Sequence, residues 1–147
     1  MNRQQFLEYT DHFNNHRWDK VVSYFCPDVT IEYPDSFMGM QTHGVTGNTL
    51  HGPKEFIANY KAIAANVREV LNVGVFISRG RHFCVEFITE FHVFQTPPGG
   101  SPGNQLKKGD VIIMNQNVLY DLDEKGKFKR IRIFHHRYID PSKAKPA

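Results

Sequence analysis

The stretch HFCVEFITEFHVFQT, residues 82–96, decides the fold class of this chain. Apolar and aromatic side chains recur there at every second position, which is the period of a β-strand. One face of the predicted strand carries Phe83, Val85, Phe87, Thr89, Phe91 and Val93. The opposite face carries His82, Cys84, Glu86, Ile88, Glu90 and His92. The pattern predicts a long strand that buries its Phe and Val face and turns the other face outward.

Further strand-like segments lie on both sides of this stretch, separated by pieces rich in turn residues. They are predicted at residues 70–78, 110–122 and 127–139, with a shorter strand at 29–34. Helical spacing of apolar residues predicts helices at 2–15, 17–25 and 52–70, the last with Pro53 in its first turn. The segment 34–52 carries four glycines and is expected to be a long loop of the kind that forms lids or binds ligands.

Helices at one end of an antiparallel sheet predict the α+β class. We expect a cone-shaped, curved antiparallel sheet wrapped around the long helix, with the N-terminal helices closing a deep pocket lined by inward-facing strand residues. No repeat or linker divides the chain, so residues 1–140 are expected to form one domain, followed by a flexible tail at 141–147.

The composition is that of a globular protein and excludes several functional classes. The chain has 147 residues, of which 40% are hydrophobic and 12 are Phe, which is enough for a real core. It shows no apolar run of membrane-spanning length and no signal-peptide pattern, so we expect a soluble cytoplasmic protein with no membrane partner. The net charge of +3 arises partly at a turn and in the tail, which does not indicate a nucleic-acid partner. Cys26 and Cys84 are expected to be reduced structural thiols.

Two segments carry a family resemblance: YTDHFNNHRWDKVVSYFCPDVTIEY at 9–33 and NQNVLYDLDEKGKFKRIRIFHHR at 115–137. The order of elements resembles the nuclear transport factor two-like and SnoaL-like proteins, and about half of the chain resembles the scytalone dehydratases. The resemblance implies that Tyr33 helps to hold the water that polarises the substrate carbonyl. It also implies that Asn117 binds a substrate hydroxyl, with Asn115 in place of a family serine. No cofactor and no metal are implied.

The chain departs from that family at several positions. Phe13 and Asn14 replace a tyrosine and an aspartate. Of the two family histidines that carry out the elimination, one position is Val93 and the other lies near Leu71 or Asn72. The same acid–base groups are therefore not expected here.

The acid–base residue is instead sought in the last strand. If Ile131 and Ile133 face the core, His135 and Arg137 face inward too, and His135 is our candidate for a general acid or base. A structural histidine packed near a strand end is an equal alternative. Asn115 and Asn117 share one side of their strand, which we interpret as the polar floor of the pocket. Further substrate contacts are expected from Phe13, Asn14, Asp35, Phe91, Val93 and Ile133.

Other polar residues have both a functional and a structural interpretation. Glu86, Glu90 and His92 could provide acid–base groups, but their face is predicted to be the outer one, where they could take part in a subunit contact. Asp35 could act as a base near the pocket mouth, although a turn cap is the favoured interpretation. His12 and His16 have a spacing compatible with a metal, yet an exposed helix face explains them better.

These patterns favour a cofactor-free enzyme of the dehydratase, isomerase or cyclase type. Its substrate would be a hydrophobic oxygenated small molecule, such as a polyketide or terpenoid intermediate, reacting through an enol or enolate. Tyr33, Asn115 and Asn117 would fix the substrate oxygens and His135 would move the proton. The alternative is a non-catalytic small-molecule-binding or dimerisation module of the same fold. In either case we expect a homo-oligomer, a dimer or trimer formed through the outer sheet face.

Overall fold

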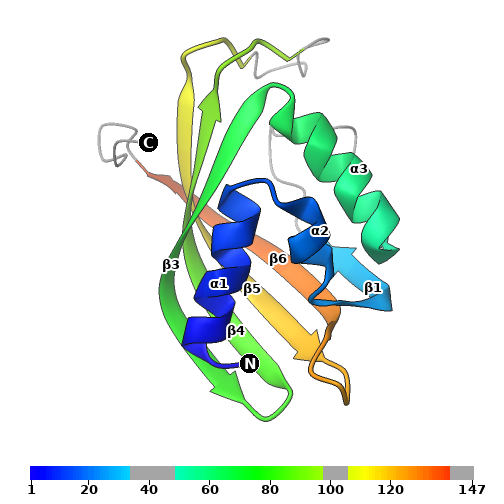
Figure 1. Ribbon diagram of the computed structural model, residues 1–147. Coiled ribbons are helices and arrows are strands. Elements are labelled where there is room, and N and C mark those ends of the chain that lie inside the picture. The colour runs from blue at the N-terminus through cyan, green and yellow to red at the C-terminus, as the bar shows by residue number, and fades with distance from the viewer. Residues whose placement is uncertain (34–48, 98–105, 140–147) are drawn as a thin grey trace.

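A computed structural model describes residues 1–33, 49–97 and 106–139, with only the backbone of 135–139. The elements follow the order α1 (Arg3–Asn14), α2 (Trp18–Val22), β1 (Phe25–Glu32), β2 (Thr49–His51), α3 (Gly52–Ala64), β3 (Val67–Arg79), β4 (His82–Val93), β5 (Val111–Leu122) and β6 (Phe128–Ile139). The strands form one curved sheet in the order β2-β1-β6-β5-β4-β3 (Figure 1). The predicted α+β class is confirmed.

The sheet differs from the expected one in the direction of one strand pair. Strands β3, β4, β5 and β6 form an antiparallel meander, as predicted, and β1 pairs antiparallel with β2. Strand β1, however, runs parallel to β6. The sheet is therefore mixed: the last strand of the meander, β6, lies next to the first strand of the chain, β1, and the two are parallel.

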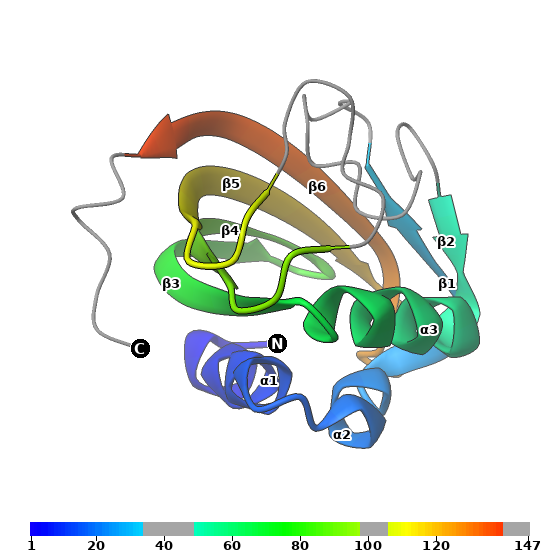
Figure 2. The same cartoon turned by 90° about the horizontal axis from the view of Figure 1, so that it is seen from above.

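The helices cover the concave side of the sheet, as the view from above shows (Figure 2). Helix α1 begins at a capping box in which Asn2 and Gln5 bond each other's backbone, and it buries Phe6, Tyr9 and Phe13. Helix α3 has a proline in its first turn, as predicted, and buries Phe56, Tyr60 and Ile63. None of the helices within the described part of the chain is long and apolar enough to span a membrane.

The core forms where these helices meet the Phe and Val face of β4. The Phe6 side chain is fully buried, and its ring lies 5.4 Å from that of Phe83 and 5.9 Å from that of Phe87. Every member of the predicted inward set of β4, from Phe83 to Val93, is buried. The alternation at 82–93 therefore correctly identified the core face of the sheet.

Asn14 fixes α1 to the edge of the sheet. Strand β3 is an edge strand, so one side of its backbone lacks a strand partner. The Asn14 side chain occupies that side at Leu71: its Nδ2 donates to the Leu71 carbonyl at 3.0 Å, and the Leu71 N–H donates to its Oδ1 at 2.8 Å. Both ends of the Asn14 amide thus bond the Leu71 backbone, which gives Asn14 a structural role, and its predicted contact with a substrate stays a prediction.

The boundary between α3 and β3 differs from the prediction in a way that affects the site. The sequence pattern predicted a helix over 52–70, but α3 ends at Ala64 and β3 begins at Val67. The prediction thus assigned Glu69 to a helix, whereas it lies in a strand. Strand β2 also occupies the end of the predicted loop, and most of that loop, including Asp35, lies outside the described residues. The expected tail at 141–147 lies outside them as well.

Candidate active site on the inner face of the sheet

Strand β5 turns a different amide inward from the two that the sequence suggested. Gln116 is buried and accepts a hydrogen bond from the Thr89 hydroxyl at 2.7 Å, on the face that packs against the helices. Asn115 points to the opposite face, where its Nδ2 donates to Glu86 Oε1 at 2.9 Å. Asn117 lies opposite Glu86 in the strand register and thus also on the outer face.

The prediction that Asn115 and Asn117 form a pocket floor is therefore wrong. The physical reason is the period of two: Met114, Val118 and Tyr120 are all buried, and they fix the even-numbered positions of β5 to the inner face. The two asparagines instead belong to the polar outer surface of the sheet.

Glu69 is the acid–base candidate on the inner face. It lies in β3 opposite Phe91, in the same alternation as the buried Val67, so its side chain is directed towards the helices. Burial raises the pKa of its carboxyl group from 4.5 to about 8. The Glu69 side chain keeps some exposed surface, and protein surrounds the rest of it. No hydrogen bond or ion pair reaches Glu69 within the part of the chain that the structure describes.

Two tyrosine hydroxyls form a pair near this carboxyl group. The Oη atoms of Tyr33, just after β1, and Tyr60, in α3, lie 3.1 Å apart. Burial raises the pKa of both hydroxyls, and the charge of Glu69 raises them further, so both stay protonated near neutral pH. One proton is used between the two oxygens, and the other is available to a ligand. The prediction that Tyr33 is a site residue is therefore compatible with its geometry.

Phe13, which has no hydroxyl, lies against the ring of Tyr60. The Phe13 ring packs edge-on against the Tyr60 ring at 5.1 Å and against Trp18 at 5.4 Å, and Phe13 is only 3% exposed. Phe13 therefore supports the Tyr60 ring from within the core, and its predicted contact with a substrate stays a prediction.

The remaining predicted contact residues divide into two groups. Phe91, Val93 and Ile133 lie on the inner face; the first two are buried, and Ile133 packs against the core. Their predicted contact with a substrate stays a prediction. His135 lies opposite Gln116 in the backbone register, where a register shift follows in β6. The side chain of His135 lies outside the described residues, as does Asp35, so their predicted roles stay predictions.

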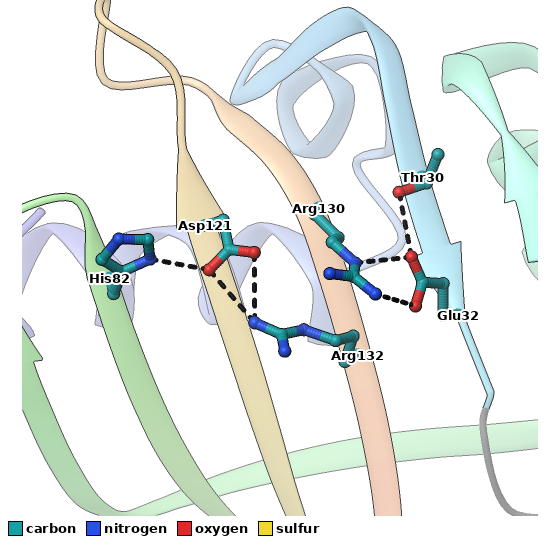
Figure 3. Close-up of polar contacts among 6 residues, drawn as sticks. All are labelled: Thr30, Glu32, His82, Asp121, Arg130 and Arg132. Atoms are coloured by element: carbon teal, nitrogen blue, oxygen red, sulfur yellow. Dashed lines mark hydrogen bonds and ion pairs between the residues drawn. The ribbon is translucent and has the colours of Figure 1, made fainter.

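The outer face carries the polar residues that the sequence placed there. His92 Nε2 and Glu90 Oε2 lie 2.8 Å apart, and Asn72 Nδ2 donates to Glu90 Oε1 at 3.3 Å. Further along the sheet, Asp121 bonds both His82, at 2.8 Å, and Arg132, at 3.1 Å (Figure 3). A neighbouring pair joins β6 to β1 (Figure 3): Arg130 Nε and Nη2 donate to the two oxygens of Glu32 at 2.6 and 2.8 Å. The contacts of Figure 3 join β4, β5, β6 and β1, although Arg132 Nε is buried without a partner among the described residues.

Metal-ligating groups do not gather within the described residues: no group of three or more His, Cys, Asp or Glu side chains could hold a metal ion there. His16 stacks on Trp18 with ring centroids 5.2 Å apart, so it is not paired with His12. Cys26 and Cys84 are free thiols, and burial raises the pKa of Cys26 to about 11.

Sequence reasoning missed Glu69 because the pattern around it was assigned to a helix. The segment also fits period two: Val67, Leu71 and Val73 share one side of the strand, and Glu69 takes the place of an apolar residue in that series. A carboxylate in the inward register of a predicted strand was the signal that could have identified it.

Solved structures resemble this fold at low sequence identity. An NTF2-like protein of unknown function from Burkholderia pseudomallei is 19% identical with a TM-score of 0.70, and the match covers 90% of this chain and 88% of that chain. A proposed polyketide cyclase from Xanthomonas campestris pv. campestris is 17% identical with a TM-score of 0.69, over 87% and 84% of the two chains. A proposed ketosteroid isomerase from Kribbella flavida is 16% identical with a TM-score of 0.60, over 99% and 82%.

These likenesses establish the fold, which is nuclear transport factor two-like, as the resemblance implied. No protein-family model matches the sequence, and no curated protein matches it. The finer resemblance to the scytalone dehydratases stays a prediction. Since one fold hosts many unrelated activities, the function has to be argued from Glu69 and its surroundings.

Proposed function

We propose that this protein is a cofactor-free enzyme of the isomerase, cyclase or dehydratase type that acts on a hydrophobic oxygenated small molecule through an enol or enolate. A polyketide or terpenoid secondary metabolite fits this description. The observation that carries the proposal is Glu69, a carboxyl group that has no partner among the described residues and whose pKa, raised by burial to about 8, lies near physiological pH. It takes the acid–base role first sought at His135.

The proposed reaction begins with a proton transfer. The Glu69 carboxylate removes a proton from the carbon next to a substrate carbonyl. The electron pair of that C–H bond forms a C=C bond to the carbonyl carbon, and the π pair of the C=O bond moves to the oxygen. The free proton of the Tyr33–Tyr60 pair forms a hydrogen bond to this oxygen as its negative charge develops. Glu69 then returns the proton to another carbon, which gives isomerisation, or to a leaving hydroxyl, which gives dehydration.

The inner face of the sheet favours an uncharged substrate. The inward positions of β3, β4 and β5 carry no Lys, Arg or His, so a substrate anion would be buried beside Glu69 without a countercharge. Aromatic side chains dominate the same surface and suit a carbon ring skeleton. The cyclase and isomerase names among the structural neighbours are consistent with this chemistry.

A non-catalytic binding module remains the second candidate, because one observation favours it. The end of the inner face around Phe6 is filled by aromatic rings: Phe76, Phe83, Phe87 and Tyr120 all lie within 5.9 Å of Phe6, centroid to centroid. This packing leaves less room for a substrate at that end. A bound ligand that does not react could still form hydrogen bonds with Glu69 and with the Tyr33 and Tyr60 hydroxyls.

Proton exchange at carbon separates these two candidates. β-Tetralone, a hydrophobic bicyclic ketone, is incubated with the protein in D₂O, and deuterium incorporation next to the carbonyl is followed by NMR. We expect catalysed exchange that increases with pH up to about 8, because Glu69 must lose its proton to act as a base. Glu69→Gln should lower the exchange rate by about a hundredfold or more.

The matched control is Glu124→Gln, since the Glu124 side chain is 92% exposed and lies outside the inner face. This control should exchange like the wild type. Exchange that is equal in Glu69→Gln and the wild type would remove Glu69 from the mechanism. Binding of β-tetralone without any exchange would favour the binding module.

A further inference from the structure

Two tyrosine hydroxyls on the inner face have no hydrogen-bond partner within the described residues. Tyr9, in α1, is only 3% exposed, and Tyr120, in β5, is only 4% exposed. Among the described residues, the fully enclosed side-chain atoms without a partner are His12 Nδ1 and Arg132 Nε. Neither tyrosine hydroxyl is one of them, so the small exposed area of each side chain includes its oxygen. A ligand oxygen can therefore reach both hydroxyls, which no group in the described part of the chain occupies.

Aromatic packing holds the two rings in place. The Tyr9 ring lies 5.0 Å from Phe128 and the Tyr120 ring lies 5.1 Å from the same Phe128. Tyr120 is also stacked on Phe83, with ring centroids 4.5 Å apart. Because neighbours enclose both rings, their hydroxyls cannot easily turn away to find a partner elsewhere.

The two hydroxyls share their surroundings with Glu69 and Tyr33. Burial raises the pKa of both hydroxyls well above the usual value, and the nearby Tyr33 and Glu69 raise it further. Tyr9 in turn contributes to the raised pKa of Tyr120 and Tyr60. The ring contacts agree: Tyr9 and Tyr120 both pack against Phe6, and Phe13, one turn after Tyr9 in α1, packs against Tyr60 with ring centroids 5.1 Å apart. Both hydroxyls keep their protons as hydrogen-bond donors.

We propose that Tyr9 and Tyr120 form a second hydrogen-bonding subsite, which binds an oxygen of the substrate other than the one held by Tyr33 and Tyr60. The substrate class is then narrower than a hydrophobic ketone: it is an uncharged, rigid ring compound with at least two oxygen groups. This inference rests on the proposed function for the placement of the reacting oxygen, but the binding of the second oxygen needs no catalysis.

A pair of flat probes tests the subsite directly. β-Naphthol carries one hydroxyl, and 2,6-dihydroxynaphthalene carries a second one at the far end of the same skeleton. Their dissociation constants are measured by isothermal titration calorimetry at about pH 6, where Glu69 and both probes are neutral. The wild type should bind the diol about tenfold more tightly, which is the effect of one or two neutral hydrogen bonds.

The double variant Tyr9→Phe/Tyr120→Phe should bring the ratio of the two dissociation constants close to one. Tyr24→Phe is the matched control, because its ring touches that of Tyr9 at 5.4 Å while its side chain is partly exposed. This control should keep the preference for the diol. A preference that survives in the double variant, or its absence from the wild type, would overturn the subsite. Failure of both probes to bind at millimolar concentration would overturn it too.

The ligand-free protein provides an independent readout. If the two hydroxyls are unpaired, Tyr9→Phe and Tyr120→Phe should leave the melting temperature unchanged or raise it. A loss of several degrees would show that both hydroxyls are already satisfied within the protein, which contradicts the subsite. The exchange experiment stays separate: a diol preference without carbon exchange would overturn the proposed enzyme alone, and exchange without a diol preference would overturn this inference alone.

Discussion

At the scale of the residue, the site depends on what surrounds each polar group more than on its type. Glu69 and Glu124 have the same side chain, yet the Glu124 side chain is 92% exposed, whereas burial raises the pKa of Glu69 to about 8. The sequence could identify Tyr33 as a site residue through its family resemblance. It could not identify Tyr60, because the contact between the two hydroxyls joins residues 27 positions apart and depends on how α3 lies over β1.

The Tyr33–Tyr60 pair should respond differently to removal of each hydroxyl. Tyr33→Phe leaves the Tyr60 hydroxyl buried without a partner, because Tyr60 is only 8% exposed, and should cost about 1–2 kcal/mol in the free energy of unfolding. Tyr60→Phe leaves the hydroxyl of the partly exposed Tyr33, which water can satisfy, and should cost less. Urea denaturation of both variants measures the difference. Equal costs would show that the two hydroxyls are equally accessible to water.

At the scale of the element, the two-residue alternation of a strand gave the correct inner face in β4. The errors in β3 and β5 arose because this alternation was not used to assign their faces. The alternation in β4 correctly assigned the inner face from Phe83 to Val93, although Glu90 on the outer face is buried as well. In β5, Asn115 and Asn117 were assigned to the inner face because their amides could bind a substrate. The inward residue is Gln116, which lies between them. In β3 the apolar spacing near the end of α3 fits helix and strand alike, so Glu69 was assigned to a helix.

The attachment of α1 to the sheet edge should be sensitive to Asn14. Asn14→Ala removes both hydrogen bonds to the Leu71 backbone and leaves that part of the edge strand without partners. We expect a loss of about 1–3 kcal/mol in the free energy of unfolding, measured by urea denaturation.

Asn15→Ala is the control for Asn14, because within the described residues the Asn15 side chain bonds only Asp11, at the exposed helix end. It should cost clearly less. Equal effects of the two substitutions would mean that the Leu71 contact contributes little to stability.

At the scale of the whole molecule, the two faces of the sheet have separate roles. The inner face combines an apolar core with a few unpaired polar groups, while the outer face carries polar groups that bond one another across four strands (Figure 3). The fold class and the two faces of β4 were predictable from local periodicity. The site was not, because Glu69 and the tyrosines come together only through the curvature of the sheet and the placement of the helices. The expected homo-oligomer stays a prediction.

The central claim, a neutral Glu69 inside the folded protein, is tested most directly by the pH dependence of global stability. Between pH 4.5 and about 8 the folded state holds one more proton on Glu69 than the unfolded state does. Unfolding free energy should therefore be fully retained below the lower value and fall on the order of a few kcal/mol as pH rises through this window.

The measurement is urea denaturation from pH 5 to pH 9 for the wild type, Glu69→Gln and Glu124→Gln. The wild type and Glu124→Gln should lose stability together as pH rises, whereas Glu69→Gln, which cannot ionise, should lose much less and become relatively more stable near pH 9. Parallel curves for all three proteins would contradict a raised Glu69 pKa and, with it, the proposed acid–base site.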